Sequence, residues 1–295
     1  MAERIDAHHH LWRYSQDQYG WIGPGMEAIA RDFLPAQLHQ QLRGNRIDGC
    51  VAVQALQTLE ETETLLAFAD DAAFIRGVVG WAPIASPQLP EVLDGWQERQ
   101  KLKGLRHVVQ AEPDDEFILR KDFNKGISRL AGIGLVYDIL IYEKHLPATI
   151  KFVDRHPNQI FVLDHIAKPR IKERVLEPWR SHLRELARRE NVYCKLSGMV
   201  TEADWQNWTA RDLEPFIETA LEAFGPPRLM FGSDWPVCLL ASSYGKWFET
   251  AGNCLAGLSA AEKGLVFGEV ATKIYSLGKS EPAKERNASS TACGS

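Results

Sequence analysis

The chain has 295 residues, of which 45% are hydrophobic and 25% charged, and its formal net charge is −5. This composition is that of an ordinary folded protein, and the length is close to the ~250 residues typical of a (β/α)₈ barrel. Lys and Arg form no basic stripe and no apolar run approaches ~18 residues, so we expect neither a nucleic-acid nor a membrane partner.

Short apolar runs rich in β-branched residues alternate with amphipathic stretches along the whole chain, which is typical of repeated βα units and a parallel sheet. Eight runs predict strands, at 4–8, 50–54, 75–81, 104–109, 134–141, 160–165, 192–197 and 228–233. Helical patterns lie between them, for example at 62–71, 147–155, 175–189 and 213–224. We therefore expect an α/β fold, a single (β/α)₈ TIM barrel over residues 1–277. Residues 278–295 lack apolar periodicity and predict a disordered tail.

The first predicted strand ends in DAHHH (6–10). Side chains alternate along a strand, so His8 and His10 face one way and His9 the other. The carboxyl ends of the strands carry the active site of a (β/α)₈ barrel, where two imidazoles can bind a metal or polarise a carbonyl. A surface histidine run, like an expression tag, is the alternative, but the position after a strand disfavours it.

Two later strands also end in polar side chains, the sixth in LDH (163–165) and the eighth in GSDWP (232–236). Alone, His165 could equally be a hydrogen-bonded core residue, and Asp234 a helix N-cap. A carboxylate at a strand end is also well placed as a general base or metal ligand. Since all strands end at one mouth of the barrel, we predict a catalytic centre of His8, His10, His165 and Asp234.

These motifs resemble the amidohydrolase superfamily and, more narrowly, its amidohydrolase-related sugar-lactonase branch. The resemblance covers residues 4–275. It is carried by the segments IDAHHHLW (5–12), KGLRH (103–107), VLDHIAKP (162–169), CKLSG (194–198) and MFGSDWP (230–236).

One departure from the superfamily bears on the metal. Two-metal members place a bridging Lys or carboxylate on the fourth strand and His on the fifth, whereas this chain offers Arg106 on the fourth and Asp138 without His on the fifth. A two-metal site is therefore incomplete. A single Zn²⁺ and metal-independent catalysis, which the sugar-lactonase branch allows, both stay open. A bound metal would be held by His8, His10, His165 and Asp234.

Other side chains at the strand ends are candidates for binding substrate. Arg106 is the best-placed permanent cation, with a surface ion pair as the alternative. Trp12 and Trp21, with Trp235, can form an apolar wall for a sugar ring. The acidic pair at 60–61 reads instead as a solvated helix start. The predicted substrate-binding residues are Gln54, Arg106, Tyr137, Asp138, Lys195 and Trp235.

The resemblance and the predicted centre together imply hydrolysis of a small sugar lactone, an L-fuconolactone-like aldonolactone, to its aldonic acid. The nearest alternative is a zinc-dependent decarboxylase or another amidohydrolase-type hydrolase. A non-catalytic sugar-binding barrel is a third class, and it would be expected to lose Asp234 or His165, both of which this chain keeps.

Cellular context follows from the cysteines and the N-terminus. The five cysteines are odd in number and include no C-x-x-C pair, which fits reduced thiols. The first residues lack an apolar signal core, so we expect a cytoplasmic protein. The expected partner is the small-molecule sugar lactone, and a homo-oligomer stays open.

Overall fold

Eight mostly buried runs form the eight strands of one parallel sheet in the computed structural model, which describes residues 2–278. Strands buried on both faces are typically hydrophobic throughout, as those at Gly49–Val53, Phe161–Leu163 and Leu229–Phe231 are, whereas the other five also contain charged or histidine residues. They pair in chain order, β1 with β2 through β7 with β8. The strands are β1 Ile5–His9, β2 Gly49–Val53, β3 Ile75–Gly80, β4 Leu102–Val108, β5 Val136–Leu140, β6 Phe161–Leu163, β7 Val192–Leu196 and β8 Leu229–Phe231.

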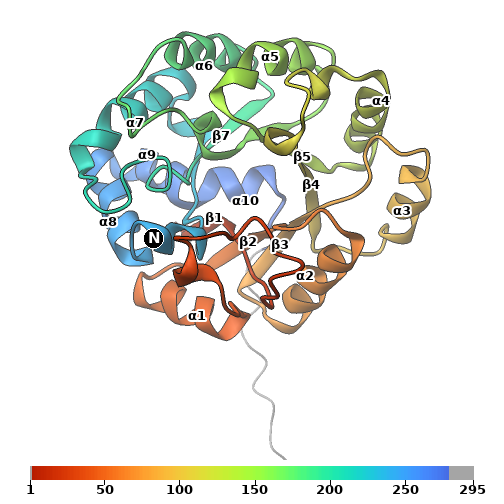
Figure 1. Ribbon diagram of the computed structural model, residues 1–295, viewed down its shortest axis with the longest axis horizontal. Helices are drawn as coiled ribbons and strands as arrows, with labels where there is room; N and C mark the ends of the chain where they lie inside the picture. Colours follow the sequence, from red (N-terminus) through yellow and green to blue (C-terminus); the bar gives the residue numbers. More distant parts are fainter. Residues whose placement is uncertain (1, 279–295) are drawn as a thin grey trace, which may run out of the picture.

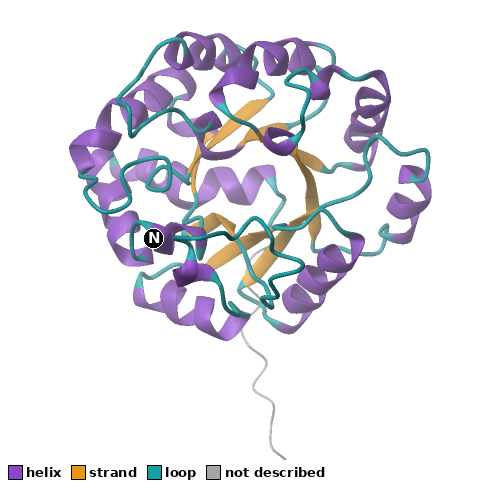
Figure 2. Cartoon of the chain, viewed as in Figure 1, coloured by secondary structure: helices purple, strands orange, loops and turns teal. Residues whose placement is uncertain are grey.

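The first and last strands close the ring just beyond their regular pairing. The Asp234 amide donates to the carbonyl of His8 at 2.8 Å, and the His10 amide donates to the carbonyl of Trp235 at 2.7 Å. Helices surround the strands as an outer ring (Figures 1 and 2). The predicted single (β/α)₈ barrel is confirmed.

Amphipathic stretches form the helices, which pack their apolar sides on the strands. The α-helices are α1 Pro35–Gly44, α2 Leu59–Asp71, α3 Leu89–Gly95, α4 Lys121–Leu130, α5 Leu146–Asp154, α6 Trp179–Ala187, α7 Ala210–Phe224, α8 Tyr244–Cys254, α9 Ala260–Gly264 and α10 Val270–Ile274. Shorter helical turns are Glu27–Ile29, Val109–Ala111, Phe117–Leu119, Ala131–Ile133, Glu143–His145, Asp164–Ala167, Pro226–Arg228, Val237–Leu240 and Leu265–Glu269.

The amino-terminal end of the barrel is filled by an apolar layer. Val51, Val136, Val162 and Met230 of the strands pack there with Tyr275, which follows α10. Figure 1 shows α10 lying across the barrel rather than in the outer ring. This end is therefore sealed, and the opposite end holds the polar strand termini.

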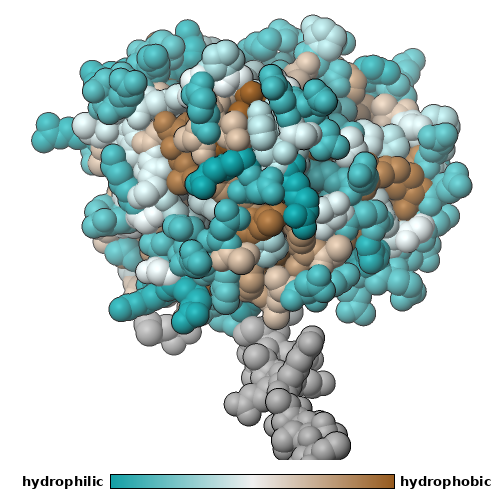
Figure 3. Space-filling view, turned by 60° about the horizontal axis from the view of Figure 1, so that its bottom comes forward, coloured by the Kyte–Doolittle hydropathy of each residue, from teal (hydrophilic) through white to brown (hydrophobic). Residues whose placement is uncertain are grey.

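The polar character of the face in Figure 3 agrees with the ordinary share of charged residues in the chain. The face in Figure 3 carries mainly hydrophilic side chains, and the apolar ones lie in small, separate groups. Across the part of the chain that the structure describes, none of the helices has the length and apolarity that a membrane span requires. Most of the predicted disordered tail, residues 279–295, lies outside the described residues.

Candidate active site

The four predicted catalytic side chains come together at the carboxyl end of the barrel. His10 Nε2 lies 3.4 Å from Asp234 Oδ1, and His8 Nε2 lies 3.7 Å from the same oxygen. The rings of His8 and His165 are 4.4 Å apart. His10, His165 and Asp234 line a cavity of about 510 Å³, with Arg106 on its wall and His8 buried beneath.

The histidines at the end of β1 point in the directions that the alternation predicted, but the pairing of β1 with β2 is irregular. Its register against β2 shifts between Asp6 and His9, so β1 carries one extra residue there. His8 and His10 both face Asp234, whereas His9 is buried with neither ring nitrogen hydrogen-bonded. His9 is therefore a core residue, and burial lowers its pKa to about 3.

His165 reaches the cavity from a left-handed turn that follows β6. Four consecutive non-glycine residues, 165–168, have φ between 45° and 62°. Left-handed backbone costs ~1–2 kcal/mol per residue in a helix, and such strain gathers at functional sites. The turn is held by the Trp179 indole, which donates to the Ile166 carbonyl at 2.7 Å, and by the 2.8 Å bond between His165 Nδ1 and Ser197 Oγ.

The protonation states suit general-base chemistry. Burial alone would raise the pKa of the Asp234 carboxyl, but the positive charge that His165 carries in the acidic range, together with the hydrogen bond and charge of His10, outweighs it and holds that pKa below its ordinary value. Asp234 is thus an ionised acceptor at neutral pH. Burial lowers the pKa of His165 to about 4, so its imidazole is neutral there.

A layer of paired charges lies beneath the cavity. Lys195 Nζ is 2.5 Å from Asp138 Oδ2, 3.0 Å from Asp164 Oδ1 and 3.2 Å from His8 Nδ1. Tyr275 donates to Asp138 at 2.8 Å from the apolar end. Burial opposes ionisation of Asp164, but Lys195, His8 and Arg106 more than offset this and hold its pKa well below the ordinary value. This layer fixes the His8 ring from below.

The predicted substrate-binding residues divide into three groups. Arg106 lines the cavity, but both terminal nitrogens of its guanidinium already donate to protein oxygens. Nη1 donates to Asp164 Oδ2 at 2.9 Å, and Nη2 donates to the backbone and side-chain oxygens of Gln54. The surface ion pair considered for Arg106 is thus absent. Asp138 and Lys195, like Gln54, are fully buried in the barrel interior.

Tyr137 and Trp235 lie away from the cavity. Tyr137 is fully buried among Phe123, Phe152 and Phe161 because it precedes Asp138 on β5 and neighbouring side chains take opposite faces. The Trp235 ring packs edge-on against Phe33, with ring centroids 5.0 Å apart. Neither ring lines the cavity.

Three functional candidates were missed by the sequence reasoning. Asp164 was passed over beside His165, although it joins Arg106 and Lys195 to His8. Lys168 was not assigned a role, although the AKP segment (167–169) indicates a turn at the barrel mouth; the left-handed backbone there brings Lys168 to the cavity wall. Glu61 was taken for a solvated helix start, which is wrong: it is 6% exposed and accepts from the amides of the loop at 55–56. The spacing TLEE (58–61) is an N-cap signal that points to this inward carboxylate.

A Zn²⁺ ion fits part of the predicted ligand set. A carbonyl oxygen only accepts, so His10 Nδ1, 2.8 Å from Val53 O, donates and leaves Nε2 bare when the ring is neutral. Two acceptors, His10 Nε2 and Asp234 Oδ1, then face each other at 3.4 Å, and a cation or proton must lie between them. His8, His10 and Asp234 form a group whose ligand atoms lie within 4.8 Å. His165 belongs instead to a second group, with His8 and Asp164.

Comparison with known proteins identifies relatives of this chain. The chain is 44% identical to an L-fucono-1,5-lactonase of Burkholderia multivorans, over 97% of this chain and 99% of that protein. It is 35% identical to an L-fucono-1,5-lactonase of Burkholderia ambifaria, over 94% and 97%. A crystal structure of a Burkholderia multivorans amidohydrolase with bound zinc superposes with a TM-score of 0.91 at 44% identity, over 94% of this chain and all of that one. The amidohydrolase family profile matches residues 5–277, and the chain belongs to that family.

Proposed function

We propose that this protein hydrolyses a neutral sugar lactone, an aldonolactone of the L-fucono or L-galactono type, to the corresponding aldonic acid. The observation that carries the proposal is an ionised Asp234 grouped with His8, His10 and His165 beside a cavity at the mouth of the barrel. The two relatives named as L-fucono-1,5-lactonases support the choice of a cyclic ester over an amide or a carboxylate substrate.

In this mechanism Asp234 is the general base. It takes a proton from a water molecule as the water oxygen attacks the lactone carbonyl. The tetrahedral intermediate then collapses, the bond between the carbonyl carbon and the ring oxygen breaks, and Asp234 returns the proton to that oxygen. An ester has a better leaving group than an amide, so this step needs less assistance.

His165 stabilises the oxyanion that develops on the carbonyl oxygen: with Ser197 Oγ donating to its Nδ1, the neutral ring carries its proton on Nε2 and can donate it in the cavity. His10 also lines the cavity, but its Nδ1 donates to the Val53 carbonyl, so its bare Nε2 assists the oxyanion only through a proton or cation held between it and Asp234. Groups held in advance in this way need no reorganisation during the reaction. A Zn²⁺ ion bound by His8, His10 and Asp234 would supply Lewis-acid polarisation of the carbonyl.

The charge state of the cavity favours a neutral substrate. Recognition of a dicarboxylate calls for free bidentate cations. Arg106 has both terminal nitrogens engaged by Asp164 and Gln54, so it polarises the site without offering a clamp. Trp21, which is 43% exposed, lies on the cavity wall and provides an apolar face for a sugar ring or a methyl group.

A panel of lactones tests the proposal. Initial rates would be followed by pH indicator, with correction for spontaneous ring opening, for aldonolactones, a dicarboxylated pyrone lactone, amides and dihydroxybenzoates. We expect aldonolactones to give the highest kcat/KM. Release of CO₂ from a dihydroxybenzoate, abolished by chelator, would identify a decarboxylase instead, and a faster dicarboxylated lactone would contradict the neutral-sugar assignment.

A further inference from the structure

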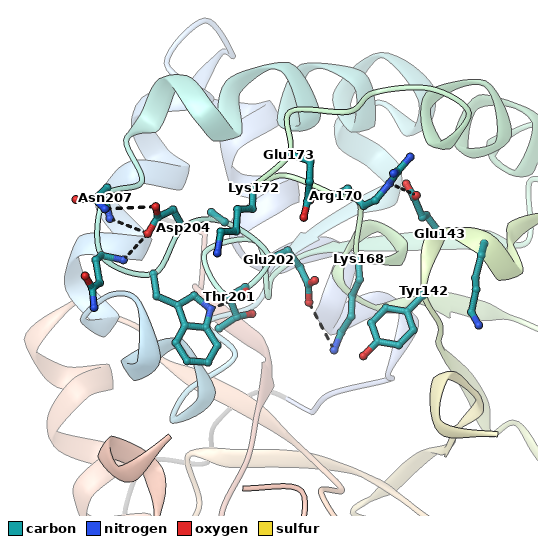
Figure 4. A pocket seen from close by; sticks show the side chains of 14 residues that line it. Tyr142, Glu143, Lys168, Arg170, Lys172, Glu173, Thr201, Glu202, Asp204 and Asn207 are labelled. Carbon is teal, nitrogen blue, oxygen red and sulfur yellow. Dashed lines mark hydrogen bonds and ion pairs between the residues drawn. The ribbon is translucent and has the colours of Figure 1, made fainter. Parts of the chain in front are cut away.

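A second cavity lies beside the catalytic one at the mouth of the barrel. It has a volume of about 970 Å³ and is formed by the loops that follow β5, β6 and β7 (Figure 4). Tyr142, Lys168 and Thr201 line both cavities. The two are therefore neighbouring parts of one depression, and we call the second part the outer groove.

Exposed aromatic rings are concentrated in this depression. Among the described residues, five large hydrophobic side chains are more than a third exposed. Three of the five line the two cavities: Trp21 in the catalytic cavity, Trp205 in the outer groove and Tyr142 in both. Aromatic rings left exposed together in a cavity mark a ligand site, because each forgoes the free energy of burial.

The two rings of the outer groove are held in place. The Trp205 indole nitrogen donates to the Thr201 carbonyl at 2.8 Å, and Lys168 Nζ lies 5.6 Å from the centre of the Tyr142 ring. Trp205 is nevertheless 37% exposed and Tyr142 39%. An anchored ring with a free face loses little conformational entropy when a ligand stacks on it.

The charges of the outer groove balance. Its lining includes four basic residues, Lys144, Lys168, Arg170 and Lys172, and four acidic ones, Glu143, Glu173, Glu202 and Asp204. Several are mutually paired: Arg170 Nε lies 2.7 Å from Glu143 Oε1, and Lys168 Nζ lies 3.8 Å from Glu202 Oε1, as Figure 4 shows. A lining of paired donors and acceptors with no net charge suits a neutral polyhydroxylated ligand and opposes a phosphorylated or polyanionic one.

We propose that the outer groove binds a second sugar unit, so that the enzyme accepts a glycosylated aldonolactone whose lactone ring lies in the catalytic cavity. The inference rests on the proposed lactonase function and extends its substrate class. Ligand cavities span ~300–1,000 Å³, so the catalytic cavity of about 510 Å³ already suffices for a single sugar lactone. The adjoining groove then provides room for a glycosyl substituent on a ring hydroxyl.

The test compares the best monosaccharide lactone with aldobionolactones that carry the same lactone unit, made by oxidising reducing disaccharides. In the Trp205→Ala variant we expect kcat/KM for the disaccharide lactone to fall roughly tenfold, the effect of losing one aromatic stacking partner. The monosaccharide lactone should keep its wild-type kcat/KM. Trp205→Phe, which retains a ring but loses the bond to Thr201, should retain most of the disaccharide activity.

Leu59→Ala is the matched control, because Leu59 is similarly exposed but lines neither cavity. Failure of wild-type enzyme to hydrolyse disaccharide lactones while it hydrolyses the monosaccharide lactone would overturn the outer subsite alone. Equal losses on both substrates in Trp205→Ala would do the same. If no lactone is hydrolysed, saturation-transfer NMR with the disaccharide alditol tests binding in the outer groove directly. Saturation transfer to the alditol that is seen with wild-type protein and lost in Trp205→Ala supports the subsite. No saturation transfer with wild-type protein refutes it.

Discussion

Gly198 lies directly against the His165 ring. A Cβ at position 198 would come 2.4 Å from His165 Nδ1, and the Gly198 φ of +63° is one that side chains rarely adopt. We expect Gly198→Ala to displace the His165 ring and break its bond to Ser197. Misplacement of about 1 Å can cost on the order of 10²-fold in rate, so kcat/KM should fall by that amount.

Gly134→Ala is the control for Gly198→Ala, because it introduces backbone strain without crowding a neighbouring side chain. Gly134 also has a positive φ, +74°, but no atom lies within 4 Å of its added Cβ. That variant should lose ~1 kcal/mol of stability through strain and keep its activity. Wild-type activity in Gly198→Ala would mean that the position of His165 does not matter for turnover.

Asp234→Asn should abolish turnover while the protein stays folded. Asparagine preserves shape but cannot accept a proton, so we expect kcat to drop at least the ~10²–10⁴-fold of general-base catalysis. Circular dichroism and thermal unfolding would establish that the fold is intact. Near wild-type kcat would assign Asp234 a structural role and send the search for the base to other carboxylates of the site.

The site should hold no more than one metal ion. His8, His10 and Asp234 form one group of ligands, while the second group shares His8, so the two cannot be filled independently. Elemental analysis of purified protein should return one equivalent or less, and activity should depend weakly or not at all on chelator. Two equivalents, lost together with activity, would contradict this prediction.

Lys195→Met should strongly destabilise the fold. The substitution leaves the fully buried Asp138 and Asp164 without their shared cation. Removing one partner of a buried ion pair costs ~3–5 kcal/mol, which urea unfolding would measure. The double variant Lys195→Met with Asp138→Asn should recover part of this loss, because it removes one uncompensated charge. Equal stability of the single and double variants would exclude the pairing as the cause.

Glu61 should make stability depend on pH. Burial raises the pKa of its carboxyl from 4.5 to about 7, although the amides of Leu56 and Ala55 and the charge of Arg106 lower it. The folded state therefore keeps the proton to higher pH than the unfolded state. The resulting stabilisation is complete below the unfolded pKa and is lost as pH rises from about 4.5 through about 7.

Glu61→Gln removes that titration. Between pH 5 and pH 8 the variant should gain roughly 2–3 kcal/mol relative to wild type in urea unfolding. Glu60→Gln is the control, because Glu60 is the exposed neighbour on the same helix and should leave the pH profile unchanged. Parallel profiles for wild type and Glu61→Gln would show that Glu61 is ionised throughout.

The sequence by itself determined the barrel and the convergence of the four side chains predicted to be catalytic. Strand and helix periods are local properties, and parallel strands joined by helices bring all their carboxyl ends to one mouth. A histidine pair at the carboxyl end of β1 and an aspartate after β8 therefore had to lie close together, although His10 and Asp234 are 224 positions apart in the chain. The inward direction of His8 and His10 followed from alternation along the strand.

Only the tertiary structure decided which polar groups are free. The sequence did not show that Tyr137 would pack among aromatic rings of α4, α5 and β6, whereas Asp138 meets Lys195 across the barrel interior. Likewise the Arg106 guanidinium donates hydrogen bonds to Asp164, which follows β6, and to Gln54, which follows β2. Ion pairing and desolvation depend on neighbours that are distant in sequence. The charges left free in the cavity, and the existence of the outer groove beside it, are therefore decided only when folding brings the loops together.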